Sequence, residues 1–305
     1  MPAIEITNLT KDYELGFFRK RRVRALDDLS LSIDHGQIFG FLGANGAGKT
    51  TTLKLLMRLI FPTTGSARIL GHDIEDVSMH QRIGYLPENP YFYDYLTARE
   101  FLDYCGEIFG LRATDRKKRT ADLLARVKLD EKRWDTQLRK FSKGMLQRVG
   151  LAQSLVNDPE IVFLDEPMSG LDPVGRREVR DLIATLRDEG KTVFMCSHIL
   201  SDIEVLCDRV AILKGGRLAQ VGHLDELRQI TEGPNRMEVL ATNADAETLR
   251  KHLADALVAP TPRGLRIEIA SEDEIEKVIA ALRQAGGKVV SIQPVKQSLE
   301  ELFLD

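Results

Sequence analysis

The clearest pattern in the sequence is the grouping of its apolar residues into short runs. Gln37–Leu42, Ile161–Asp165 and Thr192–Cys196 are nearly continuous apolar runs, which are typical of strands buried on both faces. Thr51–Ile60 differs, because its apolar residues recur at helical spacing after the loop that follows the first run. Buried strands that alternate with helices predict an α/β fold around a sheet.

The middle of the chain has a different pattern. Apolar residues between positions 97 and 157 recur at helical spacing. One predicted helix places Phe101, Leu102, Cys105, Ile108 and Phe109 on a single face. We therefore expect a helical subdomain over about residues 97–157, inserted between strands of the α/β core.

The last part of the chain is predicted to be a separate domain. The segment Thr231–Asn235 contains Gly and Pro and is typical of a linker, which divides the chain into residues 1–230 and 236–305. After it, strands are predicted at Met237–Leu240, Ala256–Ala259, Leu265–Ile269 and Lys288–Gln293, helices at Ala246–Ala256 and Glu272–Ala285, and a turn at Thr261–Gly264. The order βαββαβ predicts a small α+β domain of the ferredoxin-like kind.

Ser298–Phe303 is predicted to add a closing amphipathic helix to this domain. The sequence after the linker has no set of residues with catalytic spacing. We therefore expect an accessory, regulatory or dimer-supporting role for it.

The strongest chemical motif lies in the loop after the first buried run. Gly43–Thr50 fits the pattern GxxxxGK[ST] at every fixed position and joins a predicted strand to a predicted helix, as that pattern requires. Its glycines let backbone amides converge on a polyanion, Lys49 adds a positive charge, and Thr50 offers a hydroxyl to Mg²⁺. The residues predicted to bind the nucleotide are Gly43, Ala44, Asn45, Gly46, Ala47, Gly48, Lys49, Thr50 and Thr51. A glycine-rich turn without a ligand is the alternative.

Two carboxylates end the second buried run. Asp165 is placed to hold Mg²⁺, and Glu166 is placed to orient or deprotonate an attacking water. Adjacent acids at a strand end often form only a solvated turn. Pro167 and the loop Ser169–Asp172 follow directly, which favours the catalytic interpretation.

At this point residues 3–230 resemble the ATP-binding subunit of an ABC transporter. The segment Phe141–Arg148 sits at the family's signature position, Ser169–Asp172 resembles the D-loop, and Ser197-His198 after a predicted strand resembles the switch histidine. The resemblance implies a P-loop NTPase core that binds ATP with Mg²⁺ and hydrolyses the ATP.

The resemblance also implies roles for residues outside the phosphate-binding loop. Ser142 and Gly144, at the start of a helix, are expected to face the γ-phosphate bound by the opposite subunit. Asp172 is expected to belong to the same nucleotide site. His198 is expected to hydrogen-bond the γ-phosphate, whereas without its context a satisfied buried histidine would be the better interpretation.

Two positions depart from the family pattern. The signature is usually LSGGQ, and this chain has Phe141, Lys143 and Met145 at its first, third and fifth places. Glu88 stands where the family usually has a glutamine. Glu88 keeps an oxygen ligand for Mg²⁺ but adds negative charge beside the phosphates. Both variants resemble exporter-type subunits that pair with a separate membrane protein.

Tyr13 lies at the family's A-loop position, where its ring would stack on adenine. A tyrosine that only closes an edge strand is the alternative.

Phe17–Arg24 combines two aromatic and five basic residues without an acid. The run is interpreted first as a solvated hairpin tip, and second as a contact for anionic lipid or an acidic partner.

Composition agrees with a multidomain intracellular protein. A chain of 305 residues is long for one core, and a net charge of −3 shows no general preference for nucleic acid. Cys105, Cys196 and Cys207 lack metal-ligand spacing and are expected to be reduced packing residues. No signal peptide opens the sequence, and Lys54 and Arg58 interrupt its most apolar helix, so no transmembrane segment is expected.

The sequence therefore predicts an ATPase subunit at the cytoplasmic face of the cell membrane, acting as a head-to-tail dimer. A permease from another chain would supply the transport pathway and dock near Glu88–Tyr95, and export is the expected direction. The main alternative is a soluble ABC-type ATPase of translation or DNA repair, which normally has two cassettes or a long coiled coil. A nucleotide-binding regulator without turnover is a third possibility, and the presence of both Glu166 and His198 argues against it.

Overall fold

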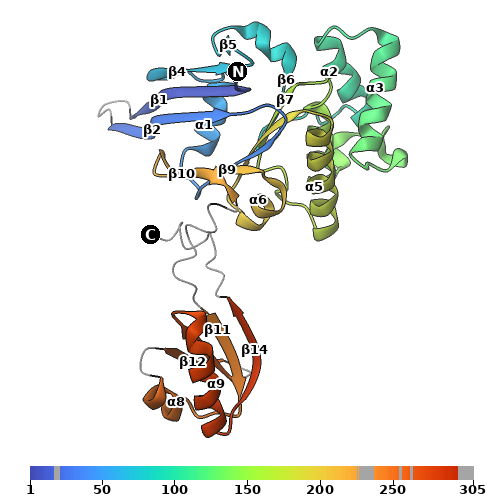
Figure 1. Ribbon diagram of the computed structural model, residues 1–305. Coiled ribbons are helices and arrows are strands. Elements are labelled where there is room, and N and C mark those ends of the chain that lie inside the picture. Colours follow the sequence, from blue (N-terminus) through green and yellow to red (C-terminus); the bar gives the residue numbers. More distant parts are fainter. Residues whose placement is uncertain (17–20, 225, 227–236, 254–255, 262–263, 295–305) are drawn as a thin grey trace. The chain divides into compact units, whose positions relative to one another are not determined.

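The computed structural model describes residues 1–16, 21–224, 226, 237–253, 256–261 and 264–294. The chain divides into two compact units, Met1–Leu224 and Asp225–Asp305 (Figure 1). Each unit has its own core. Within the described residues, no helix is both long and apolar enough to cross a membrane.

A six-stranded sheet forms the centre of the first unit, in the order β10-β9-β3-β8-β7-β6. Its strands are β3 (Ile38–Leu42), β6 (Ile83–Leu86), β7 (Ile161–Asp165), β8 (Thr192–Ser197), β9 (Arg209–Lys214) and β10 (Arg217–His223). All neighbours pair in parallel except β9 and β10. Every residue of β3, β7 and β8 is buried, as the continuous apolar runs predicted.

A second sheet of the first unit was not predicted from the sequence. It is antiparallel, with the order β2-β1-β4-β5, and contains β1 (Ile4–Leu15), β2 (Arg21–Ile33), β4 (Thr64–Ile69) and β5 (His72–Asp73). Most of β2 alternates buried and exposed residues, because only one face of this sheet meets the core. The prediction of an α/β fold around a sheet was therefore incomplete for the first unit.

The core of the first unit lies between these two sheets. Phe194 is its central aromatic residue, with ring centroids 5.3 Å from Phe41, 5.7 Å from Phe163 and 5.8 Å from Phe39. The same apolar cluster contains Ile4 of the antiparallel sheet, so it joins both sheets. Burying such large aromatic side chains supplies much of the stability of a domain.

Helices cover both faces of the six-stranded sheet (Figure 1). The helix α1 (Lys49–Leu56) contacts strands of both sheets and contributes to the core between them. The helices α5 (Pro173–Asp188) and α6 (Leu200–Leu206) contact β8 and β3. Gly40 of β3 faces α6 so closely that a Cβ would lie 3.0 Å from Ile203.

The helical subdomain contains α2 (Ala98–Ile108), α3 (Ala113–Arg126) and α4 (Lys143–Gln153). Thr97 and Glu100 form a capping box that starts α2. Phe101, Leu102 and Cys105 are buried as predicted. The prediction for Ile108 was wrong, because its side chain is 63% exposed where the helix ends and leaves the packed face. Short 3₁₀ turns occur at Val77–Arg82, Glu131–Arg133 and Leu138–Lys140.

The second unit has the predicted order βαββαβ: β11 (Met237–Thr242), α8 (Ala246–His252), β12 (Leu257–Thr261), β13 (Gly264–Ile269), α9 (Ile275–Gln284) and β14 (Lys288–Pro294). A 3₁₀ turn, Glu272–Glu274, precedes α9. The sheet order β12-β13-β11-β14 is antiparallel throughout, which confirms a small α+β domain. The predicted linker Thr231–Asn235, the closing helix Ser298–Phe303 and the centre of the turn Thr261–Gly264 lie outside the described residues.

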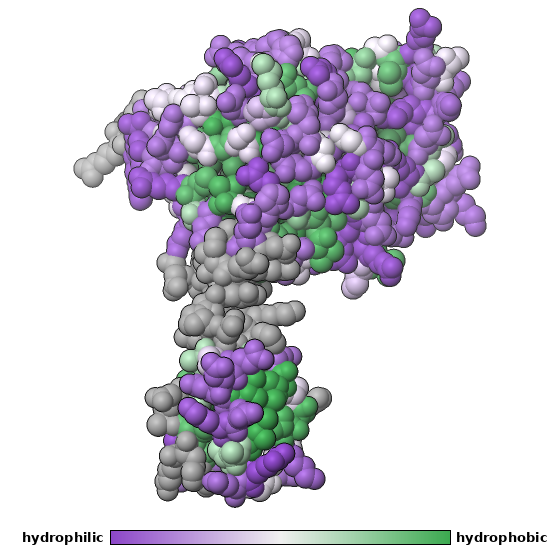
Figure 2. Space-filling model, viewed as in Figure 1, coloured by the Kyte–Doolittle hydropathy of each residue, from purple (hydrophilic) through white to green (hydrophobic). Residues whose placement is uncertain are grey.

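The core of the second unit is aliphatic. Its largest fully buried members include Val239, Leu249, Ile267 and Leu282. Figure 2 shows hydrophobic residues also reaching the surface of this unit. The exposed ones include Leu257 and Val290.

The cysteines are packing residues, as predicted. Cys105, Cys196 and Cys207 are all buried and free. Burial raises the pKa of the Cys105 thiol to about 12, so the thiol stays protonated at neutral pH.

Candidate phosphate-binding and catalytic site

The loop between β3 and α1 is shaped by its glycines. A Cβ on Gly43 would lie 2.6 Å from the carbonyl oxygen of Leu213, so no larger residue fits there. Gly48, with φ +109°, precedes α1, and no side chain caps this end of the helix. The first amides of α1 therefore stay available to an anion, which the helix dipole also favours.

Lys49, the first residue of α1, is buried and turns back over this loop. Its Nζ donates a hydrogen bond to the carbonyl oxygen of Gly43 at 2.6 Å and lies 3.8 Å from Oε1 of Glu166. The ammonium thus stands between the loop and a carboxylate from the end of β7. Sequence positions more than a hundred residues apart meet at this point.

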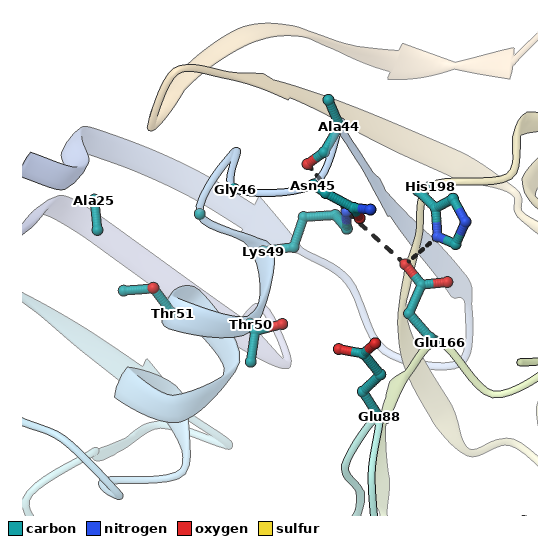
Figure 3. A pocket seen from close by; sticks show the side chains of 11 residues that line it. Ala25, Ala44, Asn45, Gly46, Lys49, Thr50, Thr51, Glu88, Glu166 and His198 are labelled. Carbon is teal, nitrogen blue, oxygen red and sulfur yellow. Dashed lines mark hydrogen bonds and ion pairs between the residues drawn. The ribbon is translucent and has the colours of Figure 1, made fainter.

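A cavity of about 310 Å³ opens beside the loop (Figure 3). Its lining includes ten residues predicted from the sequence, namely Ala44, Asn45, Gly46, Gly48, Lys49, Thr50, Thr51, Glu88, Glu166 and His198. Gly43 and Ala47 of the loop are buried behind it. Sequence reasoning missed Ala25 of β2, because no motif marks that position.

Asp165 ends β7 beside the cavity. Its side chain is buried, and neither carboxylate oxygen has a hydrogen-bond partner of normal geometry. Burial raises the pKa of Asp165 to about 6, while the nearby Thr50 hydroxyl partly opposes this rise and Glu166 and Glu88 add to it. A buried carboxylate without partners beside a threonine hydroxyl fits a Mg²⁺ site, because Mg²⁺ prefers hard oxygen ligands.

The predicted metal set of Thr50, Glu88 and Asp165 contains only two carboxylates. Nowhere in the described residues do three or more His, Cys, Asp or Glu side chains group together in a way that could hold a metal ion. Mg²⁺ commonly binds with one or two carboxylates together with phosphate oxygens and water. The residues present fit that kind of site.

Glu166 and His198 lie side by side in the cavity lining, opposite the phosphate-binding loop (Figure 3). Nδ1 of His198 lies 2.8 Å from Oε1 of Glu166, and the His198 side chain is 46% exposed, unlike a satisfied buried histidine. Glu166 has φ +51°, and its amide donates a hydrogen bond to Cys196 of β8. This uncommon backbone conformation turns the carboxylate from the end of β7 into the cavity.

The signature residues lie elsewhere on the first unit. Ser142 caps α4, its hydroxyl accepting a hydrogen bond from the amide of Met145 at 3.3 Å. Gly144 packs against the loop before α5, since a Cβ there would lie 3.3 Å from Leu171. Asp172 caps α5 and accepts a hydrogen bond from the amide of Gly175 at 2.7 Å. Ser142, Gly144 and Asp172 do not line the cavity of their own chain.

Tyr13 also lies outside the cavity lining. It stands on β1 opposite Val23, and the ammonium of Lys11 lies 5.2 Å from its ring centroid. A cation over the ring uses one of its faces. Stacking of adenine on Tyr13 stays a prediction.

The basic run at the start of β2 is partly neutralised. Arg22 and Arg24 both pair with Asp12 of β1, and Arg24 also pairs with Asp27. The hydrogen bond from Arg24 chiefly holds the pKa of Asp12 below its usual value. These pairs agree with the hairpin interpretation for Arg22 and Arg24, and residues 17–20 lie outside the described part of the chain.

A smaller cavity of about 150 Å³ adjoins Glu166 and His198 on the other side. Arg176 of α5 and the buried Asp202 of α6 contribute to it. Asp202 pairs with Arg180 at 3.7 Å. Sequence reasoning missed these residues, because charged residues on amphipathic helices carry no motif.

Comparisons with known proteins agree with the site. The profile of the ABC transporter family matches residues 26–169, and that of the C-terminal domain of DrrA1-3-like ATP-binding proteins matches residues 222–305. An uncharacterised ABC transporter ATP-binding protein of Nostoc sp. is 45% identical over 306 residues, covering 100% of this chain and 90% of the relative. The bacitracin transport ATP-binding protein BcrA of Bacillus licheniformis is 40% identical over 229 residues, a match that covers 74% of this chain and 71% of that relative.

A solved structure is similar as well. It is an ATP-binding cassette in a dimeric post-hydrolysis state with bound ADP and phosphate, and it is 26% identical to this chain. The superposition has a TM-score of 0.67 and covers 72% of this chain and 98% of the cassette.

Proposed function

This chain belongs to the family of ABC transporter ATP-binding proteins and is an ATPase, and on that premise we propose that it powers export through a separate membrane permease. The observation that carries the proposal is the cavity in which Lys49, Glu166 and His198 converge beside the phosphate-binding loop. The name of the relative BcrA, a bacitracin transport protein, supports transport of a small molecule.

ATP binds with its phosphates in the loop Gly43–Thr50. The free amides at the start of α1 and the ammonium of Lys49 neutralise the phosphate charge. Thr50, Asp165 and Glu88 would hold Mg²⁺, which supplies charge neutralisation at the phosphate oxygens when bound. The unpartnered oxygens of Asp165 support this assignment.

Glu166 acts on the attacking water. Its carboxylate is nearly buried and points into the cavity, where it accepts the proton of the water as the γ-phosphate is transferred. His198, 2.8 Å from the same carboxylate, orients it and lies exposed enough to reach the γ-phosphate. The oxygen of the water forms a bond to the γ-phosphorus as its proton passes to Glu166, and the bond between the γ-phosphorus and the bridging oxygen breaks to give ADP and phosphate.

ABC ATP-binding subunits act as dimers, as the related dimeric cassettes show. We infer a head-to-tail arrangement for two copies of this chain. Ser142, Gly144 and Asp172 do not reach the cavity of their own chain, which supports a role in the cavity of the opposite copy. Closure of such a dimer would complete each site and hydrolysis would reopen it.

The segment Glu88–Tyr95 is the proposed contact with the permease. Tyr91 is 87% exposed and Tyr95 is 60% exposed, while Phe92 between them anchors the segment on Phe101 of α2, with ring centroids 5.2 Å apart. Exposed aromatic residues on an anchored segment favour a protein contact. The segment joins the cavity at Glu88 to the helical subdomain, and the contact would hold the chain at the cytoplasmic face of the membrane.

The test is co-purification of the tagged chain from a detergent extract of its own membranes. A multi-helix membrane protein should be retained by the wild-type chain and lost with a Tyr91→Ser, Tyr95→Ser double variant. Val205→Ser on α6, also exposed, is the matched control and should retain it. Ribosomal or DNA-repair proteins as the only stable partners would contradict the transport function and favour the alternative ATPase.

A further inference from the structure

The charges around the cavity are unbalanced. Glu88 and Glu166 line it, and Asp165 lies directly behind. Among the described residues of the lining, Lys49 is the only lysine or arginine. Bound ATP adds several more negative charges, and repulsion between like charges is strong in a site that excludes water.

Glu88 is the unusual member of this group. It replaces the glutamine of the family pattern and therefore adds one negative charge to the cavity. Its side chain is directed into the cavity between Thr50 and Glu166 (Figure 3). A bound Mg²⁺ would be present with glutamine or glutamate at this position, so the added charge of Glu88 remains, and a further cation near Glu88 would offset it.

Lys143 is the second unusual residue, because it adds a positive charge to the signature segment. It follows Ser142 as the first residue of α4, and its side chain is exposed. The aliphatic stem lies across Gly170, where a Cβ would come within 2.6 Å of Cδ of Lys143. Gly170 has φ +73°, a backbone conformation that favours glycine.

The ammonium of Lys143 has no ion-pair partner within the described part of its own chain. It also lies outside the lining of its own cavity. Its stem passes over Gly170 of the loop before α5, and Lys143 directly follows Ser142 in the chain. An exposed, unpaired cation on this surface fits an acidic surface that arrives from another molecule.

We propose that Lys143 is a positioning residue that supplies, to the cavity of the opposite copy, the positive charge that Glu88 there makes necessary. The inference rests on the head-to-tail dimer of the proposed function, which brings the Ser142 surface of one copy over the cavity of the other. The negative charge added by Glu88 and the positive charge added by Lys143 then compensate each other across the dimer interface. Lys143 acts on closure of the dimer and does not touch the reacting atoms.

The test is a double-mutant cycle in the Glu166→Gln background, which should accumulate the ATP-bound dimer. The dimer dissociation constant is measured by sedimentation with MgATP for the parent, Lys143→Met, Glu88→Gln and the double variant. Lys143→Met should weaken the parent dimer about tenfold, the effect of about 1.4 kcal/mol of lost attraction. In the Glu88→Gln background the same substitution should change the constant less than about twofold.

Three controls separate charge from structure. Lys143→Arg keeps the charge and should restore dimerisation, while Lys117→Met on α3 removes an exposed lysine away from the signature segment and should have no effect. Raising the salt concentration should reduce the difference between the parent and Lys143→Met, because salt screens exposed charges. A purely structural role for the stem would instead predict little loss with Lys143→Met, because methionine keeps an unbranched stem, and no dependence of that loss on Glu88 or on salt.

The outcomes distinguish this inference from the proposed function. A parent that forms no MgATP-dependent dimer would overturn both. Suppose instead that the parent dimerises, and that Lys143→Met weakens the dimer equally with Glu88 or with Gln at position 88. That result would overturn only the pairing of Lys143 with Glu88, and Lys143 would then act on another group. Loss of ATP binding by the separated Lys143→Met monomer would also contradict it, since the residue lies outside its own cavity.

Discussion

The two units of this protein differ most in what they bury. The first unit buries Lys49, Asp165, Glu166 and Asp202, whereas the described residues of the second unit bury no polar or charged side chain. The second core consists of aliphatic residues, and the first is built around four phenylalanines. Both units combine helices and strands, so fold class does not explain why only the first unit buries charged side chains.

The difference shows where chemistry is located. Burying a charge costs free energy unless the charge is paired, and proteins retain such groups chiefly where they act on a ligand. Asp165 is the clearest case, because both of its carboxylate oxygens lack hydrogen-bond partners. The described residues of the second unit include no buried side chain of this kind.

The largest effect is expected from Glu166→Gln. The amide can hold a water but cannot accept its proton, so turnover should fall by a factor of about a hundred or more while ATP binding persists. Steady-state hydrolysis and equilibrium ATP binding measure the two properties. Glu160→Gln is the matched control, because Glu160 pairs with Arg82 outside the cavity. Hydrolysis at the wild-type rate in Glu166→Gln would remove Glu166 from the reaction.

The next effect separates the two surfaces of the proposed dimer. Lys49→Ala should weaken nucleotide binding by the monomer about tenfold or more, because it removes a charge that faces phosphates in the same chain. Ser142→Arg should leave that binding intact and block closure, because a long side chain replaces the small hydroxyl on the opposing surface. Fluorescent-nucleotide binding and ATPase rate are compared for both. Equal losses of monomer binding would refute the head-to-tail geometry.

A smaller effect concerns the free energy of unfolding that is lost when the buried Asp165 becomes ionised. Its pKa lies at about 6 in the folded protein against 3.8 for the free side chain, so the folded state holds its proton more tightly. Stability is therefore lost as pH rises, beginning near the unfolded pKa and complete above about pH 6. Relative to Asp165→Asn, the free energy of unfolding of the nucleotide-free wild type should fall by up to about 3 kcal/mol across this window. Denaturant unfolding of both proteins from pH 4 to pH 7.5 tests this, and a constant difference would contradict it.

The smallest effect is expected from removing the second unit. A chain ending at Glu232 keeps every proposed site residue and the whole core of the first unit. ATP binding should be unchanged and the melting temperature should shift by no more than a few degrees, while dimer formation falls. Calorimetry, nucleotide binding and sedimentation provide the readouts. An insoluble truncated chain would show that the two units share a core.

Local sequence predicted much of the fold, for physical reasons that differ between regions. Strands such as β7 are buried on both faces and so appear as unbroken apolar runs. The second unit followed from the order of its strand-like and helical segments, because its residues are sorted simply into core and surface. The antiparallel sheet of the first unit was missed, because β1 and β2 are long, carry register shifts and mix charged residues with apolar ones.

The sequence by itself determined which residues have the right chemistry, because the glycine loop with Lys49 and the pair Asp165 and Glu166 are contiguous motifs. Only the tertiary structure decided which of them meet. It placed His198 2.8 Å from Glu166, added Ala25 to the cavity and left Ser142 outside it. Spacing along a chain fixes residue types and local conformation, whereas the distance between side chains from β3, β7 and β8 depends on how the sheet orders its strands.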